Sequence, residues 1–563
     1  KRTGNAVTSG RSLHRDAGRR VRRGPRGLRP RLGVGERDQH AGVVVVAADP
    51  DTFVEDGEAE SVAQFVDGVS YGRARLTRAP FFDLERVEVL RGPQSVLFGK
   101  NTTAGALSLV TRTPGDEFAG NVTATVMPEF ESYQVNAGVD LPLGETLGLR
   151  IATRWLDDGG YVSNPNQGRD EPQRDEFAIR GTLQWEPTAR FDATLKLEHS
   201  EYDTTGRQTE IVRDIATTTI PAGPLAGTPL TYQVGLAGAG LPGAITDTEF
   251  NFIRDANADE VSDNELFNAT LTANYDTDWA LITSVTGFVS YDRDEVADLD
   301  FTNASILAGV VRESYDQFSQ EVRIASREDQ TLSWIAGGYY QSSELANDDM
   351  TSFLANMTNL GFGPIANTGI ERNYQQDADA FALFGQLTWN VSDDLRLIGG
   401  LRWTTEEKDA TRQLTLTQTP LDFGGPLVSD PVALFIVSGP LGVALDNPGG
   451  AGHNLDQDRS EDRATPSITV EYDVNPDLML FASYREGFKG GGFDVRGNST
   501  AFFEFDEERF GTLVEKASRI QHTLESEGLP ASPDDIPFEK CDCYFCEQET
   551  LTDESDFPGD RDA

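Results

Sequence analysis

The feature that most constrains the fold of this chain is a long series of segments in which apolar and polar residues alternate. In one of them, Phe177, Ile179 and Leu183 fall on one face. Arg180 and Gln184 fall on the other face of the same segment. Because successive side chains of a β-strand point to opposite faces, this alternation predicts strands that separate two different media. About 13 such segments are present, near residues 118–127, 132–141, 146–157, 175–186, 190–203, 264–276, 279–293, 315–327, 331–343, 379–391, 394–407, 463–474 and 477–488.

The connections between these segments differ by parity. Those after the second, fourth, sixth, eighth, tenth and twelfth segments are turns of only a few residues. Those after the third, fifth, seventh, ninth and eleventh segments are long, at 158–174, 204–263, 294–314, 344–378 and 408–462. Short turns on one side and long loops on the other are typical of outer-membrane β-barrels, whereas a soluble sandwich has no reason to sort its loops in this way.

Composition narrows the class further. The 563 residues carry 48 Lys+Arg against 92 Asp+Glu, a formal net charge of -44. This balance argues against a nucleic-acid partner, because such binding relies on Lys and Arg that neutralise phosphates. No run of about 18 apolar residues occurs, so no transmembrane helix is predicted. We therefore predict an all-β fold, a transmembrane antiparallel β-barrel in the bacterial outer membrane, whose polar inner face implies a wet or plugged lumen.

One stretch supplies a candidate plug. Residues 66–114 read VDGVSYGRARLTRAPFFDLERVEVLRGPQSVLFGKNTTAGALSLVTRTP and closely resemble the C-terminal half of the plug of TonB-dependent outer-membrane receptors. FSQEVRIAS (318–326), ALFGQLTWNVSDDLRLIGGLRWTTEEKD (382–409) and LFASYREGFKGGGFD (480–494) are similar to barrel segments of the same family. The resemblance covers roughly residues 55–500 and implies a barrel of about 22 strands occluded by an N-terminal plug.

The resemblance also implies a function. It predicts uptake of a scarce large ligand, most readily a ferric siderophore, with cobalamin, haem or saccharides as other ligands of the family. Capture on the long loops would be followed by plug movement driven by the TonB energy-transducing complex. It further implies a monomer in contact with outer-membrane lipid and lipopolysaccharide, with no catalysis and no cofactor. Tyr71, Arg73 and Arg75 lie in the stretch expected at the plug apex and are the candidate ligand-binding residues.

Two further sets of residues follow from the plug-like stretch. Gly92, Gly99 and Gly105 permit tight turns and close backbone approach, and Pro93 fixes the turn after Arg91. The resemblance implies that the plug arginines Arg86 and Arg91 pair with carboxylates of the barrel wall, with candidates at Glu321, Glu406 and Glu407. Breaking a buried pair is costly, so such pairs could lock the plug until force is applied.

The sequence divides into four parts. Residues 1–50 are basic and predict a disordered or damaged N-terminus, residues 51–116 a partial plug, and residues 117–500 a partial barrel. Neither a signal peptide nor a TonB box is readable in residues 1–50, and about 13 of roughly 22 strands are present. We therefore expect a chain truncated at both ends relative to the family. A barrel with open edges is not expected to seal on its own, because lipid cannot satisfy unpaired strands.

Residues 501–563 are predicted to be a tail outside the barrel, a short α-helical and acidic segment that contains the cysteines. Apolar residues recur there at helical spacing, namely Phe510, Leu513, Val514, Ala517, Ile520 and Leu524. Cys541, Cys543 and Cys546 could supply three thiolates to zinc or an iron–sulfur cluster, or remain unliganded in an acidic tail. This pattern leaves an alternative open, in which a metal-binding or enzymatic C-terminal domain is fused to a non-functional receptor fragment.

Overall fold

The computed structural model describes residues 43–46, 62–216, 218–219, 229–327, 330–445, 450–475, 478–500, 503–506 and 508–518. Strands account for most of the regular structure in these ranges. No helix within the same ranges is long and apolar enough to cross a membrane.

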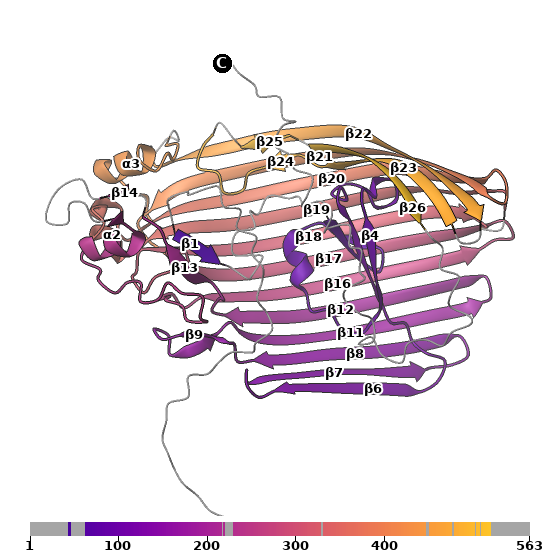
Figure 1. Ribbon diagram of the computed structural model, residues 1–563, viewed down its shortest axis with the longest axis horizontal. Coiled ribbons are helices and arrows are strands. Elements are labelled where there is room, and N and C mark those ends of the chain that lie inside the picture. Colours follow the sequence, from indigo (N-terminus) through magenta and orange to yellow (C-terminus); the bar gives the residue numbers. More distant parts are fainter. Residues whose placement is uncertain are drawn as a thin grey trace, which may run out of the picture.

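Fourteen antiparallel strands form one curved sheet, which we call the wall, and each strand is hydrogen-bonded to its neighbour in the series (Figure 1). From one edge to the other they are β6 (Ala119–Met127), β7 (Ser132–Pro142), β8 (Leu147–Asp158), β11 (Gln173–Thr188), β12 (Phe191–Thr205), β16 (Val261–Asp276), β17 (Ala280–Asp298), β18 (Leu307–Ser326), β19 (Leu332–Phe353), β20 (Thr368–Asn390), β21 (Leu395–Thr417), β22 (Gly452–Asn475), β23 (Leu478–Lys489) and β26 (Glu508–Ser518). Among the described residues the wall does not close, and β6 and β26 are its two edges.

All 13 predicted strand segments are confirmed, from β6 to β23, and the six short turns join the pairs that the sequence indicates. The strands extend further toward the long connections than predicted. For example, the predicted loop 344–378 shrinks to residues 354–367, because β19 and β20 continue their ladder up to the pair Phe353 and Thr368. Backbone pairing thus continues beyond the stretch in which the side chains alternate between apolar and polar.

The outward face of the wall changes character along each strand. On β20, Trp389, Leu383 and Phe381 face outward and are 47%, 53% and 40% exposed. The next outward residues along the same strand are Asp379 and Asp377, which are also exposed. An apolar band that begins beside the short turns and gives way to carboxylates matches the lipid-facing belt of a membrane β-sheet and its water boundary.

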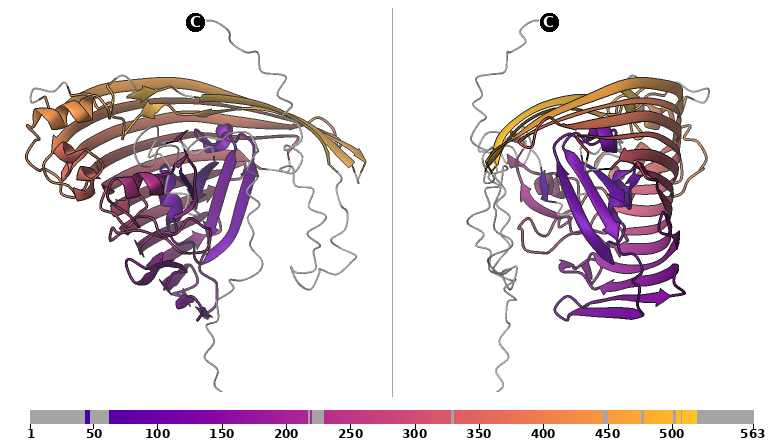
Figure 2. Two further views of the ribbon diagram at one scale, coloured as in Figure 1. Left: turned by 60° about the vertical axis from the view of Figure 1, so that its left-hand side comes forward. Right: turned by 90° about the vertical axis from the view of Figure 1, so that its right-hand side faces the viewer.

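The plug lies on the concave side of the wall (Figure 2). Its elements are β2 (Val62–Val66), β3 (Val69–Tyr71), the 3₁₀ helix η2 (Ala74–Arg78), β4 (Leu84–Arg91), the one-turn helix α1 (Ser95–Phe98) and β5 (Gly105–Thr111). The four strands form a sheet in the order β3-β2-β5-β4, in which β2 and β5 are parallel. Residues 66–114 therefore occupy the concave face of the wall, as the resemblance implies.

The predicted plug turns are in place. Gly92 and Gly99 have φ angles of 72° and 87°, in the left-handed region that favours glycine. Pro93 follows Gly92 in the turn between β4 and α1. At Gly105 a Cβ atom would collide with the carbonyl oxygen of Leu90, so glycine is needed there for a close backbone approach.

The helix prediction for the C-terminal tail is wrong over residues 510–518, because these residues form β26 and pair with β23. The apolar spacing of this segment fits a helix, but β23 offers a row of unpaired backbone groups, and tertiary pairing overrides a local pattern of this length. The wall thus continues beyond residue 500, at which the sequence analysis predicts that the barrel ends. The remainder of the predicted tail lies outside the described residues.

The long connections pack together at one end of the wall into a loop layer (Figure 1). It contains β9 (Val162–Asn164), β10 (Arg169–Glu171), β13 (Glu210–Asp214), β14 (Thr218–Thr219), β15 (Pro229–Leu230), α2 (Tyr232–Gly238), η3 (Ala355–Thr358), η4 (Gly363–Ile365) and α3 (Pro431–Ser438). β1 (Val43–Val46) pairs with β13. Leu236, Ile365 and Val437 from three connections are buried in one hydrophobic cluster, which gives this layer a core of its own.

Candidate functional site at the plug–wall interface

Buried ion pairs join the plug to the wall. Arg73, between β3 and η2, donates from Nη2 to Glu313 Oε1 on β18 at 3.1 Å, and the two side chains are 5% and 0% exposed. The second oxygen of Glu313 accepts from Asn347 Nδ2 at 3.0 Å. The carboxylate is therefore satisfied on both oxygens, which is the condition under which a buried ion pair is stable.

A second pair joins β12 to the turn after β2. Lys196 Nζ donates to Asp67 Oδ2 at 2.7 Å. Asp67 also accepts from the backbone nitrogen and the hydroxyl of Thr111, each at 2.8 Å. Burial alone would raise the pKa of Asp67, but Lys196 and the hydrogen bonds of Thr111 outweigh it and lower that pKa. Asp67 therefore stays charged inside the protein.

A third contact joins β8 to the start of β4. Arg150 donates from Nε and Nη2 to the two oxygens of Asp83 at 2.7 and 2.5 Å, and from Nη1 to Asp140 at 2.7 Å. Beside it, Arg180 on β11 donates to the carbonyl of Phe82 at 3.0 Å, with its guanidinium 4.2 Å from the centre of the Phe82 ring. Bidentate and stacked contacts of this kind depend on the planar guanidinium.

The tip of the plug makes the fourth contact. Lys100, which follows α1, forms an ion pair with Glu406 on β21. Directly before it, the backbone of Gly99 lies against the guanidinium of Arg402, so close that a Cβ would sit 3.1 Å from Nη2. Arg402 lies between the rings of Tyr339 and Phe384, at 5.6 and 5.4 Å. Gly99, Lys100, Tyr339 and Arg402 border a cavity of about 60 Å³ between plug and wall.

The locking prediction for Arg86 and Arg91 is wrong. Arg86 is half exposed and pairs with Glu85 and Glu88 of its own strand, at 3.3 and 2.6 Å. Arg91 is also exposed and, within the ranges that the structure covers, forms no ion pair with Glu321. β4 is an edge strand of the plug sheet and most of its residues are exposed, so Arg86 and Arg91 lie in solvent and do not pack against the wall.

Of the three predicted wall carboxylates, one contacts the plug and two do not pair with it in the described part of the chain. Glu406 does face the plug, and there it pairs with Lys100. Glu407 points outward and is exposed, as strand alternation requires of the residue next to an inward one. Glu321 pairs with Arg323 of its own strand at 3.0 Å. Sequence reasoning missed Lys100, although its place at a glycine turn after α1 marks it as a plug tip.

Tyr71, Arg73 and Arg75 are all buried. The hydroxyl of Tyr71 accepts from Asn268 Nδ2 at 2.7 Å, and burial together with nearby Glu198 raises the pKa of Tyr71. In this state Tyr71 and Arg73 therefore bond to the wall. A role of the three residues in ligand binding stays a prediction.

Between the plug and the loop layer, the inward face of the wall carries cations that the sequence analysis did not single out. Arg372 on β20, Lys408 and Arg412 on β21 and Arg459 on β22 are buried or nearly so. The signal was present in the alternation of β21, where Lys408 and Arg412 share the inward face. The outward residues beside them include Glu407 and Asp409. The strands, rather than the loops, thus supply buried cations toward the bore, and among the described residues all of these except Arg412 have a carboxylate within ion-pair distance.

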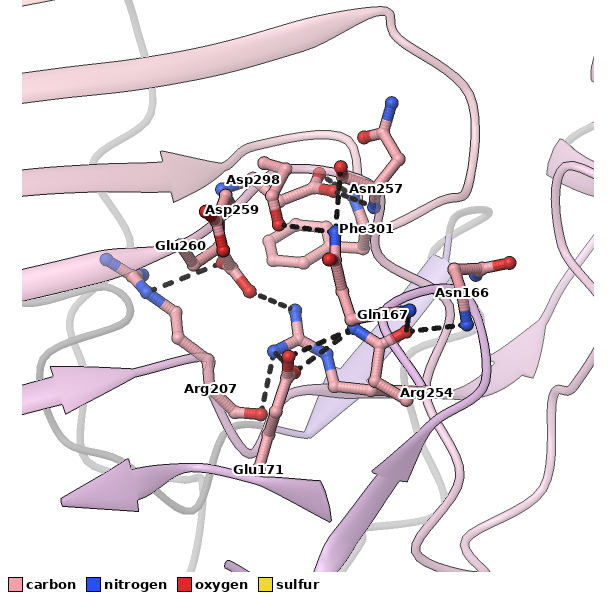
Figure 3. Close-up of polar contacts among 12 residues, drawn as sticks. Asn166, Gln167, Glu171, Arg207, Arg254, Asn257, Asp259, Glu260, Asp298 and Phe301 are labelled. Carbon is pink, nitrogen blue, oxygen red and sulfur yellow. Dashed lines mark hydrogen bonds and ion pairs between the residues drawn. The ribbon is translucent and has the colours of Figure 1, made fainter. Parts of the chain in front are cut away.

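A buried polar network ties the loop layer to the ends of the strands (Figure 3). Arg254 is 1% exposed, donates from Nη1 to Glu171 at 3.0 Å and places Nη2 2.7 Å from Glu260. Asp298 and Asp300 lie nearby, and Asp298 accepts from the backbone nitrogens of Asp300 and Phe301 at 3.0 and 2.8 Å. Burial raises the pKa of Asp298 and Asp300, and for Asp298 the neighbouring carboxylates add to this effect.

The metal prediction is not tested by the structure. Cys541, Cys543 and Cys546 lie outside the described residues, so their role as zinc or iron–sulfur ligands stays a prediction. Within the described residues, no group of three or more His, Cys, Asp or Glu side chains is arranged to hold a metal ion.

A curved sheet with an apolar outer band, and a charge-paired plug on its concave side, together define the plugged wall of a membrane β-sheet protein. The model of the TonB-dependent receptor-like β-barrel matches residues 214–513, and that of the TonB-dependent receptor plug domain matches residues 42–106. The chain belongs to the TonB-dependent receptor family. These receptors are outer-membrane proteins of Gram-negative bacteria, and they are transporters rather than enzymes.

Similar proteins agree with this assignment. The chain is 22% identical over 440 residues to the pesticin receptor of Yersinia enterocolitica, covering 77% of this chain and 53% of that protein. It is 28% identical over 183 residues to the probable TonB-dependent receptor BfrD of Bordetella pertussis, covering 32% and 22% of the two chains. The chain spans about half the length of the pesticin receptor that it matches.

Solved structures share the fold. The ferric yersiniabactin uptake receptor FyuA from Yersinia pestis superposes with a TM-score of 0.62 at 16% identity, covering 84% of this chain and 62% of that chain. The siderophore receptor PiuA from Acinetobacter baumannii superposes with a TM-score of 0.54 at 13% identity, covering 83% and 63%. At these identities the likeness establishes the fold alone.

Proposed function

We propose that this chain takes up a ferric siderophore across the outer membrane in a TonB-dependent manner. The observation that carries the proposal is a plug seated in the concave wall through buried ion pairs, with inward-facing cations of the wall on its loop side. The names of similar proteins support the ligand class, since FyuA is a ferric yersiniabactin uptake receptor and PiuA a siderophore receptor. Other large nutrients of the family are the competing ligands.

The ion pairs suit a plug that must hold against diffusion yet yield to force. Removing one partner of a buried pair costs several kcal/mol because the other charge is left uncompensated. The pairs Arg73–Glu313 and Lys196–Asp67 would therefore hold the plug at rest. In the proposed cycle, ligand capture at the loop layer and the bore is followed by a pull from TonB, which breaks these contacts and opens a path along the wall.

Uptake measurements test the proposal. The full chain would be expressed in a Gram-negative host that lacks its own siderophore receptors, with and without TonB, and radioactive iron would be supplied as a panel of ferric siderophores. We expect iron accumulation from at least one of them in the host with TonB only. Surface expression would be checked with antibody. Accumulation that is equal in both hosts, or absent for the entire panel despite surface expression, would contradict the proposal.

A further inference from the structure

Residues 490–500, which follow β23, pack against inward-facing residues of the wall and against the plug, and we call them the strap. The strap contains β24 (Gly492–Phe493), which pairs with β25 (Glu504–Phe505). Phe493 and Val495 are buried in the same hydrophobic cluster as Tyr71 of the plug and Tyr374 of β20. The strap therefore lies between the plug and the loop layer, in the space that a ligand from the loop side would enter.

Arg412 is the central contact of the strap. Its guanidinium is 1% exposed and donates from Nη1 to the carbonyl of Asp494 at 2.6 Å and from Nη2 to the carbonyl of Ser499 at 3.0 Å. Nη2 also lies 3.3 Å from Nε2 of His453, and the ring of Phe503 lies 4.7 Å from Cζ. Within the described part of the chain, no carboxylate lies within ion-pair distance of Arg412, and its Nε has no hydrogen-bond partner.

Two other cations also contact the strap, although each of them has a carboxylate partner on the wall as well. Lys408 Nζ donates to the carbonyl of Gly491 at 2.7 Å. Arg372 Nη2 donates to Oδ1 of Asn498 at 2.6 Å, while its Nη1 pairs with Asp349 at 2.5 Å. The strap atoms that accept hydrogen bonds from these cations are thus neutral oxygens, and the one described carboxylate that acts on Arg412 from the strap, that of Asp494, makes no ion pair with it. Burial, opposed by Asp494 and reinforced by the like charge of Arg372, lowers the pKa of Arg412 to about 10.

Neutral carbonyls are weak partners for a buried guanidinium. Hydrogen bonds between a guanidinium and an ionised oxygen are roughly twice as strong as bonds between neutral groups. A buried charge without a counter-charge is also expensive to maintain. An anion that presents several oxygen atoms would therefore bind Arg412 and Arg372 more tightly than the strap does, and its charge would relieve their mutual repulsion.

The strap is also hydrogen-bonded to the plug at one end and to the loop layer at the other. At its start, the backbone nitrogen of Gly490 donates to Oδ1 of Asn101 in the plug at 3.2 Å, and the nitrogen of Asn101 donates to the carbonyl of Phe488 at 3.0 Å. At its other end, the carbonyl of Asn498 accepts from the nitrogen of Ala444 in the loop layer at 2.9 Å. One segment therefore contacts the loop layer, the cations and the plug tip.

We propose that the strap occupies, in the free protein, a site at which Arg372 and Arg412 bind an oxygen-rich anionic ligand, and that binding of this ligand displaces the strap and loosens its contact with the plug at Asn101. The inference rests on the proposed uptake function and names the charge of the ligand, an anionic ferric chelate rather than a neutral or cationic one. It also couples ligand binding to the plug, because the strap is hydrogen-bonded to Asn101 of the plug.

Hydrogen exchange on the full chain, refolded in detergent, tests the displacement. The probes are ferric citrate and inorganic pyrophosphate, which are both anionic and rich in oxygen, and cationic ferric ferrioxamine B serves as the contrast. We expect the two anions to raise exchange several-fold in peptides that cover residues 490–500 and, to a smaller degree, residues 99–103. The cationic chelate should leave both unchanged. Binding of either anion without a change in strap exchange would overturn the displacement.

Two variants and a control locate the site. Arg412→Gln should weaken anion binding about tenfold or more, because a charge-assisted contact is lost. Asn498→Ala loosens the strap without changing the cations and should strengthen anion binding several-fold, because less of the protein is in the closed form. Arg396→Gln removes an exposed cation that pairs with Glu471 near a short turn and should leave affinity unchanged. Equal loss in Arg396→Gln and Arg412→Gln, or no anion binding to wild type and Asn498→Ala, would overturn the inference.

The two proposals fail separately. TonB-dependent uptake of cationic or neutral chelates alone would keep the proposed function and remove the anionic site. Displacement of the strap by anions in a chain that supports no TonB-dependent uptake would keep the site and remove the function.

Discussion

The plug–wall interface and the strap both bring buried charges together, but they satisfy them differently. At the interface, Arg73 has the carboxylate of Glu313 as its partner, and Lys196 has that of Asp67. At the strap, Arg412 has two backbone carbonyls and no described carboxylate within ion-pair distance. Opposite charges in a dry interface resist separation, whereas a cation held by neutral oxygens accepts a better partner. The contrast distinguishes a contact built to hold from one built to be replaced.

The largest effect is expected from breaking one interface pair. Glu313→Ala removes the carboxylate that pairs with the buried Arg73 and also removes the acceptor of Asn347. We expect the plug to lose about 3–5 kcal/mol of stability. Protease digestion of the plug in intact outer membranes, measured against urea concentration, gives the change.

The control is Glu344→Ala, which removes an exposed carboxylate from the outer face of β19 and should change little. A double variant that combines Glu313→Ala with Arg73→Ala should be less damaging than the sum of the single changes, because the uncompensated charge is gone. Equal effects of Glu313→Ala and Glu344→Ala would erase the contrast between interface and strap.

A second change tests whether the shape of the plug matters as much as its charges. Gly105→Ala places a Cβ against the carbonyl of Leu90 between β4 and β5. The strands must shift, at a cost of about 1–3 kcal/mol. The same protease assay applies, with Gly181→Ala as the matched control because nothing lies within 4 Å of a Cβ there. Tolerance of Gly105→Ala would show that the ion pairs alone hold the plug.

The sequence predicted the wall well because alternation and the parity of the connections are local signals, and 13 strands follow from them. It failed at β26, where pairing with β23 decides the structure. At the interface, alternation put Glu406 on the inner face, but its partner Lys100 is separated from it by 306 residues. Pairings at such distances depend on how the plug is oriented against the wall, which no local pattern encodes. The strap escaped prediction for the same reason.

The loop layer should respond to pH. Burial raises the pKa of Asp298 and Asp300 above the ordinary value near 4. A carboxyl with a raised pKa in the folded state stabilises the fold fully below its unfolded pKa, and this stability is lost as the pH rises through the folded value. The protection of residues 298–306 from hydrogen exchange, expressed relative to the intrinsic rate at each pH, should therefore decrease from about pH 4 toward neutral. Asp298→Asn should flatten this dependence, and an unchanged slope would contradict the assignment.

The smallest effect is expected at Arg86, on the face of the plug that points away from the wall. Its two partners, Glu85 and Glu88, belong to the same strand, so the pairs cannot resist movement of the plug against the wall. They are also exposed, where water screens the attraction between charges. Arg86→Ala should therefore leave the protease resistance of the plug within error of wild type, under conditions in which Glu313→Ala lowers it. A loss comparable to that of Glu313→Ala would mean that the exposed edge strand of the plug also stabilises its position. Ion pairs between plug and wall would then not be what holds the plug in place.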